Sequence, residues 1–280
     1  MRLVDSRNGG KTGARKSASK PVYHLALNAK SMGGARCALL PGDPARVETI
    51  ATTPPLEGSC QLAHKREYRT WLGYIHGVPV VITSTGIGGP STSIAVEELA
   101  RLGVETFLRV GTSGAIQPHI EVGDVVITTG AVRLEGASTH YAPIEYPAVA
   151  HHRLVGALVE AATSLGIPYH VGITCSSDTF YPGQEREDSF SGYIPRRFQG
   201  ITEEWRRLHV LNYEMEAATL LTMCAALGLR GGCVTGVVDI HAAGGRITQH
   251  SLKRAEGNVV RVAAKALEIL VREDGRYRGT

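Results

Sequence analysis

The sequence has few cysteines, few aromatic residues and no long apolar run. No CxxC pair occurs, which argues against a disulfide or zinc framework and predicts reduced, buried thiols in a cytoplasmic protein. Aromatic residues make up 6%, too few for surfaces that stack the bases of long nucleic acids. No apolar run reaches the roughly 18 residues that span a membrane. We therefore expect neither a nucleic acid nor a membrane as a partner. The cysteines are Cys37, Cys60, Cys175, Cys224 and Cys233.

The basic charge of the chain is concentrated at its beginning. Residues 1–20 contain six basic residues against Asp5, a net charge of +5, so the other 260 residues carry −1 of the total of +4. This stretch is rich in Gly, Ser and Lys, and we expect a disordered, solvated tail. It has no apolar segment of the kind found in secretory signals, although an organelle transit segment is an alternative.

The remaining chain, residues 21–280, alternates predicted strands and helices without a linker. This pattern predicts a single α/β domain. We expect strands that end at Leu40, over 106–110 and over 231–240, and a hairpin that turns at His76-Gly77. Val22 to Leu27 is predicted as a short extended segment. Two predicted helices begin at Pro44 and Pro90, where proline is favoured at the first position. Two others end just before Gly166 and Gly228. The last two cover residues 203–208 and 251–272.

Two segments offer groups that suit a phosphate. The turn Pro41-Gly42-Asp43 puts free backbone N–H groups at the end of a strand, with Arg46 one helical turn later. The alternative is an ordinary strand-to-helix turn with a surface arginine. Arg109 lies within the apolar strand that precedes Gly111-Thr112-Ser113-Gly114. A charge there needs an anion, which is either a protein carboxylate or a ligand phosphate.

Two further segments suit a polar ring and a sugar. A loop gathers an aromatic ring, an amide and a cation in Phe180, Gln184 and Arg186, a set that fits a flat heterocycle or an exposed loop. The stretch EMEAATLLTMCAALG carries Glu214 and Glu216 before a predicted helix. Two residues apart, they do not share a helical face. They are either solvated acids at a helix N-terminus or, with Glu214 in extended chain, carboxylates that can point into a cleft.

Several long motifs resemble those of the bacterial uridine phosphorylases, a family of the nucleoside phosphorylase-I superfamily. They are LPGDPARVETIA, REYRTW, STGIGGPSTSIAVEELARLG, FLRVGTSGAIQPHIEVGDV, SSDTFYPGQER and NYEMEAATLLTMCA. The resemblance runs from about Tyr23 to about Gly236. It implies a single-domain phosphorylase fold with a central mixed, barrel-like sheet flanked by helices. It also implies a hexamer built as a trimer of dimers, with active sites shared between subunits.

The resemblance implies reversible phosphorolysis of a nucleoside, with phosphate as co-substrate and no organic cofactor. It assigns catalysis to Arg109, Glu216, Gln184 and Arg186. It assigns phosphate binding to Gly42, Arg46, Arg109 and Thr112, with Arg66 from the neighbouring subunit. It assigns ribose binding to Met215 and Glu216, with His24 from the neighbour. It assigns base binding to Phe180, Gln184 and Arg186, and a K⁺ site at the dimer interface to Glu67, Ile87 and Ser91.

The chain departs from the family pattern at Asp239-Ile240-His241. Uridine phosphorylases typically have an apolar residue followed by Asn-Arg there, so His241 replaces a supporting arginine. Asp239 falls where purine nucleoside phosphorylases carry an aspartate that assists protonation of N7. The base site therefore includes Asp239 and His241, and base specificity is either for uridine or altered towards purines. We favour uridine because the PGQER motif is intact.

Other classes of function remain open on the sequence. A nucleoside-binding protein without turnover, or a hydrolase that uses water, would not need the phosphate set of Arg46, Arg66, Arg109 and Thr112. A structural or nucleic-acid-binding role would depend on the basic tail alone.

Overall fold

A computed structural model describes residues 20–241 and 248–277 of the chain. Its strands are β1 (Cys37–Leu40), β2 (Glu57–Lys65), β3 (Tyr68–Ile75), β4 (Val78–Thr83), β5 (Thr106–Ala115), β6 (Val125–Leu134), β7 (Ala148–Val149), β8 (Tyr169–Ser177), β9 (Val210–Glu214) and β10 (Arg230–Ile240). Its α-helices are α1 (Pro44–Ala51), α2 (Gly89–Arg101), α3 (His152–Leu165), α4 (Ile201–Arg207), α5 (Ala217–Ala226) and α6 (Gln249–Tyr277). Short 3₁₀ turns are η1 (Ala137–His140), η2 (Pro182–Gln184) and η3 (Arg196–Phe198).

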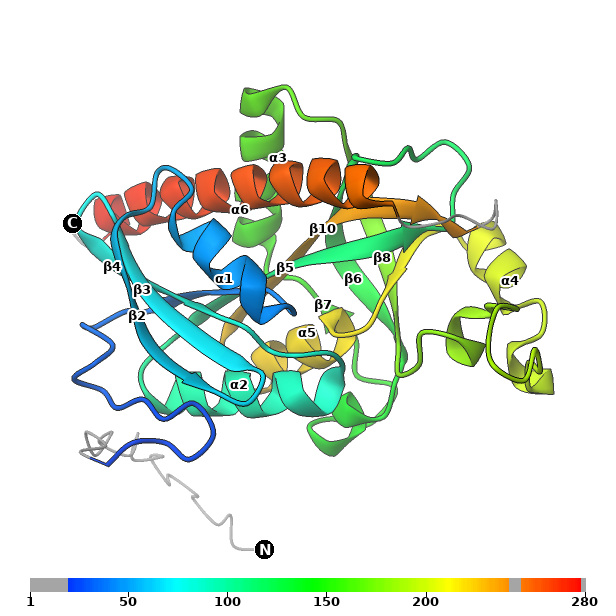
Figure 1. The fold of residues 1–280 in the computed structure, drawn as a ribbon, viewed down its shortest axis with the longest axis horizontal. Helices are drawn as coiled ribbons and strands as arrows, with labels where there is room; N and C mark the ends of the chain where they lie inside the picture. Colours follow the sequence, from blue (N-terminus) through cyan, green and yellow to red (C-terminus); the bar gives the residue numbers. More distant parts are fainter. Residues whose placement is uncertain (1–19, 242–247, 278–280) are drawn as a thin grey trace, which may run out of the picture.

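The strands form one mixed sheet that closes on itself. The strand order is β10-β6-β8-β9-β5-β1-β4-β3-β2, with β7 beside β6. Because β10 also pairs with β5, the strands β10, β6, β8, β9 and β5 form a closed, barrel-like ring. The remaining strands extend outward from β5 through β1 (Figure 1). The predicted α/β fold with a mixed, barrel-like sheet is confirmed.

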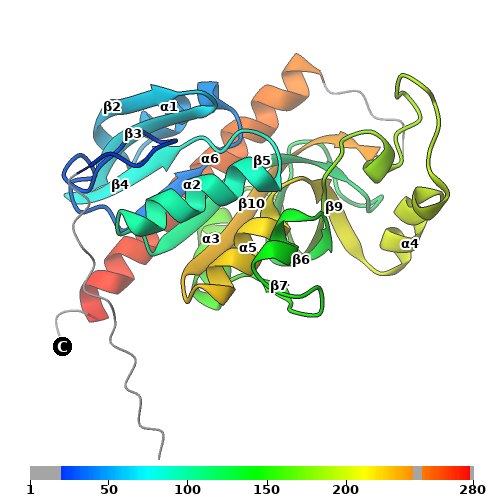
Figure 2. The same ribbon diagram turned by 90° about the horizontal axis from the view of Figure 1, so that it is seen from below.

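Helices cover both sides of the sheet and enclose two apolar cores. On one side α1, α3 and α6 pack against the strands, through residues such as Ile50, Leu158 and Leu267. On the other side α2 and α5 pack together with the segment that precedes β1. Figures 1 and 2 show α6 and α2 on opposite sides of the strands. Both cores hold the strand ends in place, and those ends carry the residues discussed below.

Local sequence signals explain several elements. His76 and Gly77 both have positive φ, 49° and 77°, and join β3 to β4 in the predicted hairpin. Asp43 caps α1 by accepting a hydrogen bond from Ala45 N at 2.8 Å, and Pro44 begins the helix as predicted. Gly228, just after α5, has φ 70°, as expected for a glycine that ends a helix.

Two predictions about the backbone were wrong. We expected the strand to end before Gly111, but β5 continues through Gly114 to Ala115 because β10 pairs with it along this whole length. Residues 22–27 were predicted as extended, yet they form a turn in which Ala26 N donates to Val22 O. β2 was also not predicted, since most of its residues are exposed or partly exposed and carry no apolar pattern.

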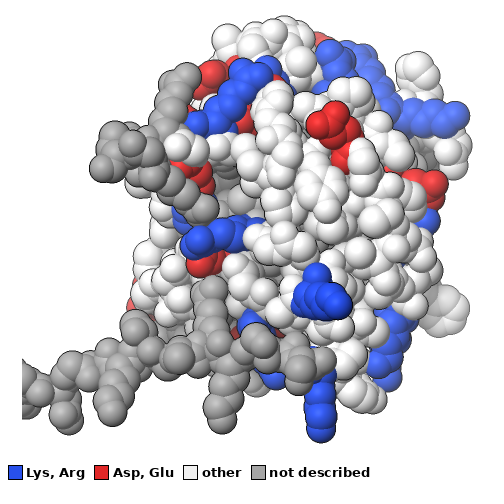
Figure 3. Space-filling view, turned by 90° about the vertical axis from the view of Figure 1, so that its left-hand side faces the viewer, with Lys and Arg blue, Asp and Glu red and all other residues white. Residues whose placement is uncertain are grey.

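Charged side chains of both signs are interspersed on the face shown in Figure 3, around a broad uncharged area. The tail predicted to be disordered lies, apart from Lys20, outside the described residues, and so do residues 242–247. Within the described chain, no helix combines the length and the apolar character needed to cross a bilayer.

Candidate active site

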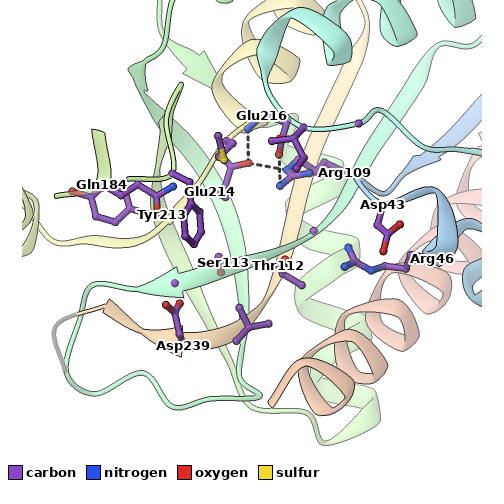
Figure 4. A pocket seen from close by; sticks show the side chains of 18 of the residues that line it. Asp43, Arg46, Arg109, Thr112, Ser113, Gln184, Tyr213, Glu214, Glu216 and Asp239 are labelled. Carbon is purple, nitrogen blue, oxygen red and sulfur yellow. Dashed lines mark hydrogen bonds and ion pairs between the residues drawn. The ribbon is translucent and has the colours of Figure 1, made fainter. Parts of the chain in front are cut away.

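A cavity of about 460 Å³ opens at the carboxyl ends of the parallel strands β1, β5 and β10. Loops that follow β1, β4 and β8 and the connection from β9 to α5 complete its lining. Ligands of α/β proteins commonly bind at this edge of a sheet, where loops from several strands converge. Figure 4 shows the side chains that face the cavity.

One end of the cavity gathers donors for an anion. Gly42 and Asp43 form the turn after β1, and Arg46 extends from the first turns of α1. Thr112 faces the cavity from β5, opposite Arg46 (Figure 4). An arginine fork beside a hydroxyl and backbone N–H groups suits a phosphate. The residues predicted to bind phosphate are therefore brought together in the cavity, except for Arg66, which does not line it.

Arg109 lies in the interior and is paired with two carboxylates. Its Nε donates to Glu214 Oε2 at 2.8 Å, and its Nη2 lies 2.5 Å from Glu216 Oε2. Burial alone would lower the pKa of Arg109, but the charges of Glu216 and Glu214 raise it above its ordinary value. The guanidinium also lies against Gly111, where an added Cβ would come within 2.6 Å of Nη2. The anion that Arg109 needs is thus supplied within the protein.

Glu214 is fully engaged by the protein around it. Its carboxylate accepts hydrogen bonds from the backbone N–H groups of Glu216 and Ala217 and from the Ser176 hydroxyl, in addition to Arg109. Its side chain has no exposed surface. Glu214 is among the residues that line the cavity, but its carboxylate is occupied in capping the start of α5 and in neutralising Arg109.

Glu216 is the carboxylate nearer the cavity. Its Oε1 accepts a hydrogen bond from Gly88 N at 2.5 Å, and its Oε2 faces Arg109. Burial raises the pKa of Glu216; Arg109 opposes this shift and Glu214 adds to it. The net direction is upward, so Glu216 takes up a proton more readily than an exposed glutamate. A ligand that binds Arg109 would release Oε2 to accept other hydrogen bonds.

The opposite end of the cavity presents groups that suit a planar ring. Gln184 is 3% exposed and faces the cavity from η2 (Figure 4). The Arg186 guanidinium stacks over the Phe180 ring at 4.1 Å from its centroid. The Gln184 amide and the Arg186 guanidinium can form hydrogen bonds with the polar edge of a heterocycle while Phe180 contacts its face. The base-binding set predicted from the sequence is therefore brought together.

Asp239 alters this end of the cavity. Its Oδ2 accepts a hydrogen bond from Arg186 Nη2 at 2.9 Å, and its side chain is 1% exposed. Three buried atoms nearby have no hydrogen-bond partner among the described residues: Asp239 Oδ1, Arg186 Nε and His241 Nδ1. Such atoms are costly unless a ligand or water meets them. Burial lowers the pKa of His241, and Arg186 lowers it further, so its ring is neutral at pH 7.

The structure gathers most of the predicted site residues in one cavity but leaves some outside it. Residues that line the cavity are Gly42, Arg46, Ile87, Arg109, Thr112, Phe180, Gln184, Arg186, Met215, Glu216 and Asp239. Residues outside the lining are His24, Arg66, Glu67, Ser91 and His241. His24 is held by Glu98, whose Oε1 lies 2.8 Å from its Nδ1. His241 packs edge-on against Tyr213, with ring centroids 5.1 Å apart.

The predicted cation residues lie around one glycine. A Cβ built on Gly86 would lie 2.8 Å from Glu67 Cγ and 3.4 Å from Ser91 Oγ. The Ile87 side chain is exposed. No cluster of three or more His, Cys, Asp or Glu side chains suited to a metal occurs within residues 20–241 and 248–277.

Sequence reasoning missed several residues that shape the site. Tyr213 and Ser113 line the cavity, Ser176 and Gly88 donate to the two glutamates, and Glu256 of α6 pairs with Arg46. Each contact joins residues from separate elements, and Glu256 lies 210 positions from Arg46. Only the alternation of residues along β5 and β9 could have indicated that Ser113 and Tyr213 are inward-facing.

The fold and the cavity together define an α/β protein whose cavity gathers groups suited to an anion at one end and groups suited to a polar ring at the other. The chain belongs to the phosphorylase superfamily, whose family model matches residues 36–273. It is 54% identical over 250 residues to the uridine phosphorylase of Escherichia coli K12, covering 89% of this chain and 98% of that protein.

Two further relatives bear on the base site. The uridine phosphorylase of Thermococcus kodakarensis is 48% identical, covering 90% of this chain and 87% of that protein. The guanosine phosphorylase of Halorubrum lacusprofundi is 42% identical over 200 residues, covering 71% of this chain and 76% of that protein.

Proposed function

We propose that this protein is a nucleoside phosphorylase that converts uridine and phosphate, reversibly, to uracil and ribose 1-phosphate. The observation that carries the proposal is one cavity with an anion site at one end and ring-binding groups at the other, and the Glu216 carboxylate between them. The similarity to uridine phosphorylases supports uridine as the substrate. Phosphate is the co-substrate, and no organic cofactor is needed.

In this proposal phosphate binds between Arg46, Arg109 and Thr112. A phosphate oxygen forms a bond to C1′ of the ribose while the bond from C1′ to N1 of uracil breaks, and its electron pair leaves with the base. The transition state has a cationic, oxocarbenium-like sugar. Held in place beside C1′, the phosphate loses little further entropy in the reaction. The donors also offset repulsion between the dianion and the anionic leaving group.

Glu216 then binds the ribose. When phosphate takes up the Arg109 Nη2 donor, Glu216 Oε2 becomes available to the ribose hydroxyls, while Gly88 N still holds Oε1 at 2.5 Å. Met215 packs against the same sugar. The carboxylate charge favours the cationic sugar more strongly than the neutral substrate, which is the condition for catalysis.

Gln184 and Arg186 bind the uracil edge and stabilise negative charge on the departing base, and Phe180 stacks on the ring. No covalent intermediate is required. The experiment is to incubate the purified protein with uridine, with and without inorganic phosphate, and to identify the products. We expect uracil and ribose 1-phosphate, with turnover that requires phosphate. Uracil and free ribose at equal rates without phosphate would indicate a hydrolase, and no turnover would indicate a binding protein.

A second candidate is phosphorolysis of purine nucleosides. Asp239 Oδ1, which no described residue contacts by a hydrogen bond, can accept one from a base donor such as a purine ring N–H. The relative from Halorubrum lacusprofundi, a guanosine phosphorylase, supports this alternative. If the protein acts on purine nucleosides, Asp239→Asn should lower kcat/KM for guanosine by about tenfold or more and should change kcat/KM for uridine less. An equal loss for both nucleosides would argue against a purine-specific role.

We further propose a hexamer, arranged as a trimer of dimers, in which His24 and Arg66 complete the neighbour's site and Glu67, Ile87 and Ser91 bind K⁺ at the dimer interface. His24 and Arg66 lie outside this chain's own cavity, and the Tyr23 and Ile87 side chains are 68% and 78% exposed. The exposed Tyr23 is adjacent to His24, and the exposed Ile87 is one of the proposed K⁺ residues. These observations support an interface at Tyr23 and Ile87.

Mixing two inactive variants tests the sharing of sites. Neither Arg66→Ala nor Arg109→Ala should be active alone, but subunits exchanged between them should regain phosphorolysis, because some sites then hold both arginines. Light scattering gives the oligomeric state, and titration of K⁺ against turnover tests the cation. Absence of regained activity in demonstrably mixed oligomers would contradict a shared site.

A further inference from the structure

Arg46 is already held by an acidic residue that lies outside the cavity lining. Its Nε donates to Glu256 Oε1 at 3.0 Å, and its Nη2 bonds to the same oxygen. Glu256 belongs to α6, whereas Arg46 belongs to α1, and the two helices pack on the same side of the sheet. The Arg46 side chain is 9% exposed and that of Glu256 is 28% exposed. Arg46 is therefore shielded from water, whereas the Glu256 side chain is partly exposed to it.

The geometry leaves a second edge of the guanidinium available. One carboxylate oxygen takes an N–H of Nε and an N–H of Nη2, and no hydrogen bond from a described residue occupies the edge between Nη1 and Nη2. A guanidinium is planar and rigid, and it can hold two anions in bidentate fashion on different edges. In Figure 4 the guanidinium end of Arg46 points across the cavity toward Thr112. Glu256 thus bonds to one edge while another is left for a ligand.

An arginine on a short helix would otherwise have many rotamers. Fixing such a side chain costs conformational entropy, and this cost weakens ligand binding unless the protein already holds the side chain in place. The contact between Glu256 and Arg46 orders the arginine side chain before phosphate binds, so phosphate binding loses less conformational entropy. α6 is long and packs against the core through residues such as Val259 and Leu267, which makes it a firm support for Glu256.

We propose that Glu256 is a positioning residue for the phosphate site, which orients Arg46 through α6 without contacting substrate. The inference depends on the proposed function for its kinetic test, but phosphate binding can be measured without turnover. It assigns to α6 a part in co-substrate affinity that no motif of the sequence indicated.

The test compares Glu256→Gln with the native chain. We expect the Kd for inorganic phosphate, measured by calorimetry, to rise about five- to twentyfold, since one charge-assisted contact to Arg46 is weakened. KM for phosphate should rise in parallel, and KM for uridine should change much less. Glu160→Gln, at an exposed position on α3, is the matched control and should change neither constant.

A double-mutant cycle separates positioning from a general loss of structure. In the Arg46→Ala background, Glu256→Gln should have no further effect on the phosphate Kd, because its action runs through Arg46. Glu256→Asp, which keeps the charge but shortens the reach, should also weaken binding. An unchanged or lower phosphate Kd in Glu256→Gln would overturn the proposal, and a lower one would mean that Glu256 competes with phosphate. Additive effects in the cycle would also overturn it. If no nucleoside is turned over, the proposed function fails while the binding measurements still decide this inference.

Discussion

Among the residues that the structure describes, three arginines line the cavity, and each has a carboxylate partner in the protein. Arg109 pairs with Glu214 and Glu216, Arg186 with Asp239, and Arg46 with Glu256. Unpaired guanidinium groups would be costly at this depth. Pairing keeps them charged and oriented, and ligand groups then compete with or add to these partners. Whether an arginine keeps its carboxylate when a ligand binds therefore determines which donors that end of the cavity offers to the ligand.

Glu216 and Glu214 are predicted to contribute differently. Glu216→Ala should lower kcat for phosphorolysis by about a hundredfold or more, since it removes the group that stabilises the cationic sugar. Glu214→Gln should lower kcat far less but should destabilise the fold, because a buried charge pair and a helix cap are weakened. Steady-state kinetics and thermal unfolding of both variants test this division. The reverse order of effects on kcat would refute it.

The raised pKa of Glu216 predicts an acid limb in the pH profile. Catalysis needs the ionised carboxylate, so kcat/KM should fall as pH falls through a pKa above the ordinary glutamate value of about 4.3. Glu216→Gln should be slow at every pH and should lack this limb. The measurement is kcat/KM for uridine between pH 4.5 and 8, at assay points where native protein remains folded. A limb that persists in Glu216→Gln would assign it to another group.

The sequence predicted the kinds of residue at the site better than their partners. An arginine in an apolar strand indicated that Arg109 needs an anion, and the structure supplies Glu214 and Glu216. The sequence could not choose between a protein carboxylate and a ligand, because the partners lie 105 residues away or more. Likewise Asp239 was identified as unusual, but its pairing with Arg186 depends on how the loop after β8 folds back.

At the level of elements, the segment around η2 is anchored by Glu185, which lies between Gln184 and Arg186, the two residues proposed to bind the edge of the base. Glu185 has φ 53°, and its carboxylate accepts hydrogen bonds from the backbone N–H groups of Gly200 and Thr202, at the start of α4. Turned towards α4, Glu185 leaves Gln184 and Arg186 to line the cavity. The loop is therefore fixed to a helix that itself lies outside the site.

Glu185→Ala should selectively weaken nucleoside binding. Without this anchor Gln184 and Arg186 lose their fixed positions, so KM for uridine should rise about tenfold while KM for phosphate stays nearly constant. Glu187→Ala, two residues later at an exposed position, is the control. Initial rates at varied uridine and varied phosphate separate the two constants. Equal changes in both would mean that the loop does not act on the base end alone.

Boundaries of elements were predictable where local chemistry determines them. Asp43 and Pro44 begin α1, His76-Gly77 turns the hairpin, and Gly228 follows α5, all as expected. The end of β5 was not predictable in this way. Glycines normally terminate a strand, yet pairing with β10 keeps residues 111–114 extended, and the close packing of Arg109 against Gly111 leaves no room for a side chain.

At the level of the whole molecule, α6 joins distant parts of the fold. Near its beginning Glu256 holds Arg46, and near its end Asp274 pairs with Arg230 of β10 at 2.7 Å and with Arg153 of α3 at 2.8 Å. The single α/β fold was predictable from alternating elements. Closure of the barrel was not, because it depends on β10 pairing with both β5 and β6; that expectation came from the family resemblance.

The pair around Asp274 predicts a pH-dependent contribution to stability. The hydrogen bond from Arg230 lowers the pKa of Asp274, with burial opposing it. A carboxyl group with a lowered folded-state pKa stabilises the fold above its unfolded pKa of about 3.9, and this stability is lost as pH falls through the folded value.

Asp274→Asn should therefore lower the free energy of unfolding at pH 7 by about 1–2 kcal/mol, as expected for a partly buried pair. It should also flatten the acid-dependent loss of stability as pH falls below the unfolded pKa of about 3.9. Denaturant unfolding at several pH values measures both effects, and Glu57→Gln, exposed on β2, is the control. A pH dependence identical to that of the native chain would contradict the assignment.

We propose that the site carries out phosphorolysis of uridine although Asp239 lies beside Arg186. The most direct measurement is kcat/KM for uridine, inosine and guanosine at saturating phosphate, with the same preparation of the full chain. We expect the highest value for uridine, with ribose 1-phosphate as the sugar product. A higher value for inosine or guanosine would contradict it and would make Asp239 the determinant of a purine site.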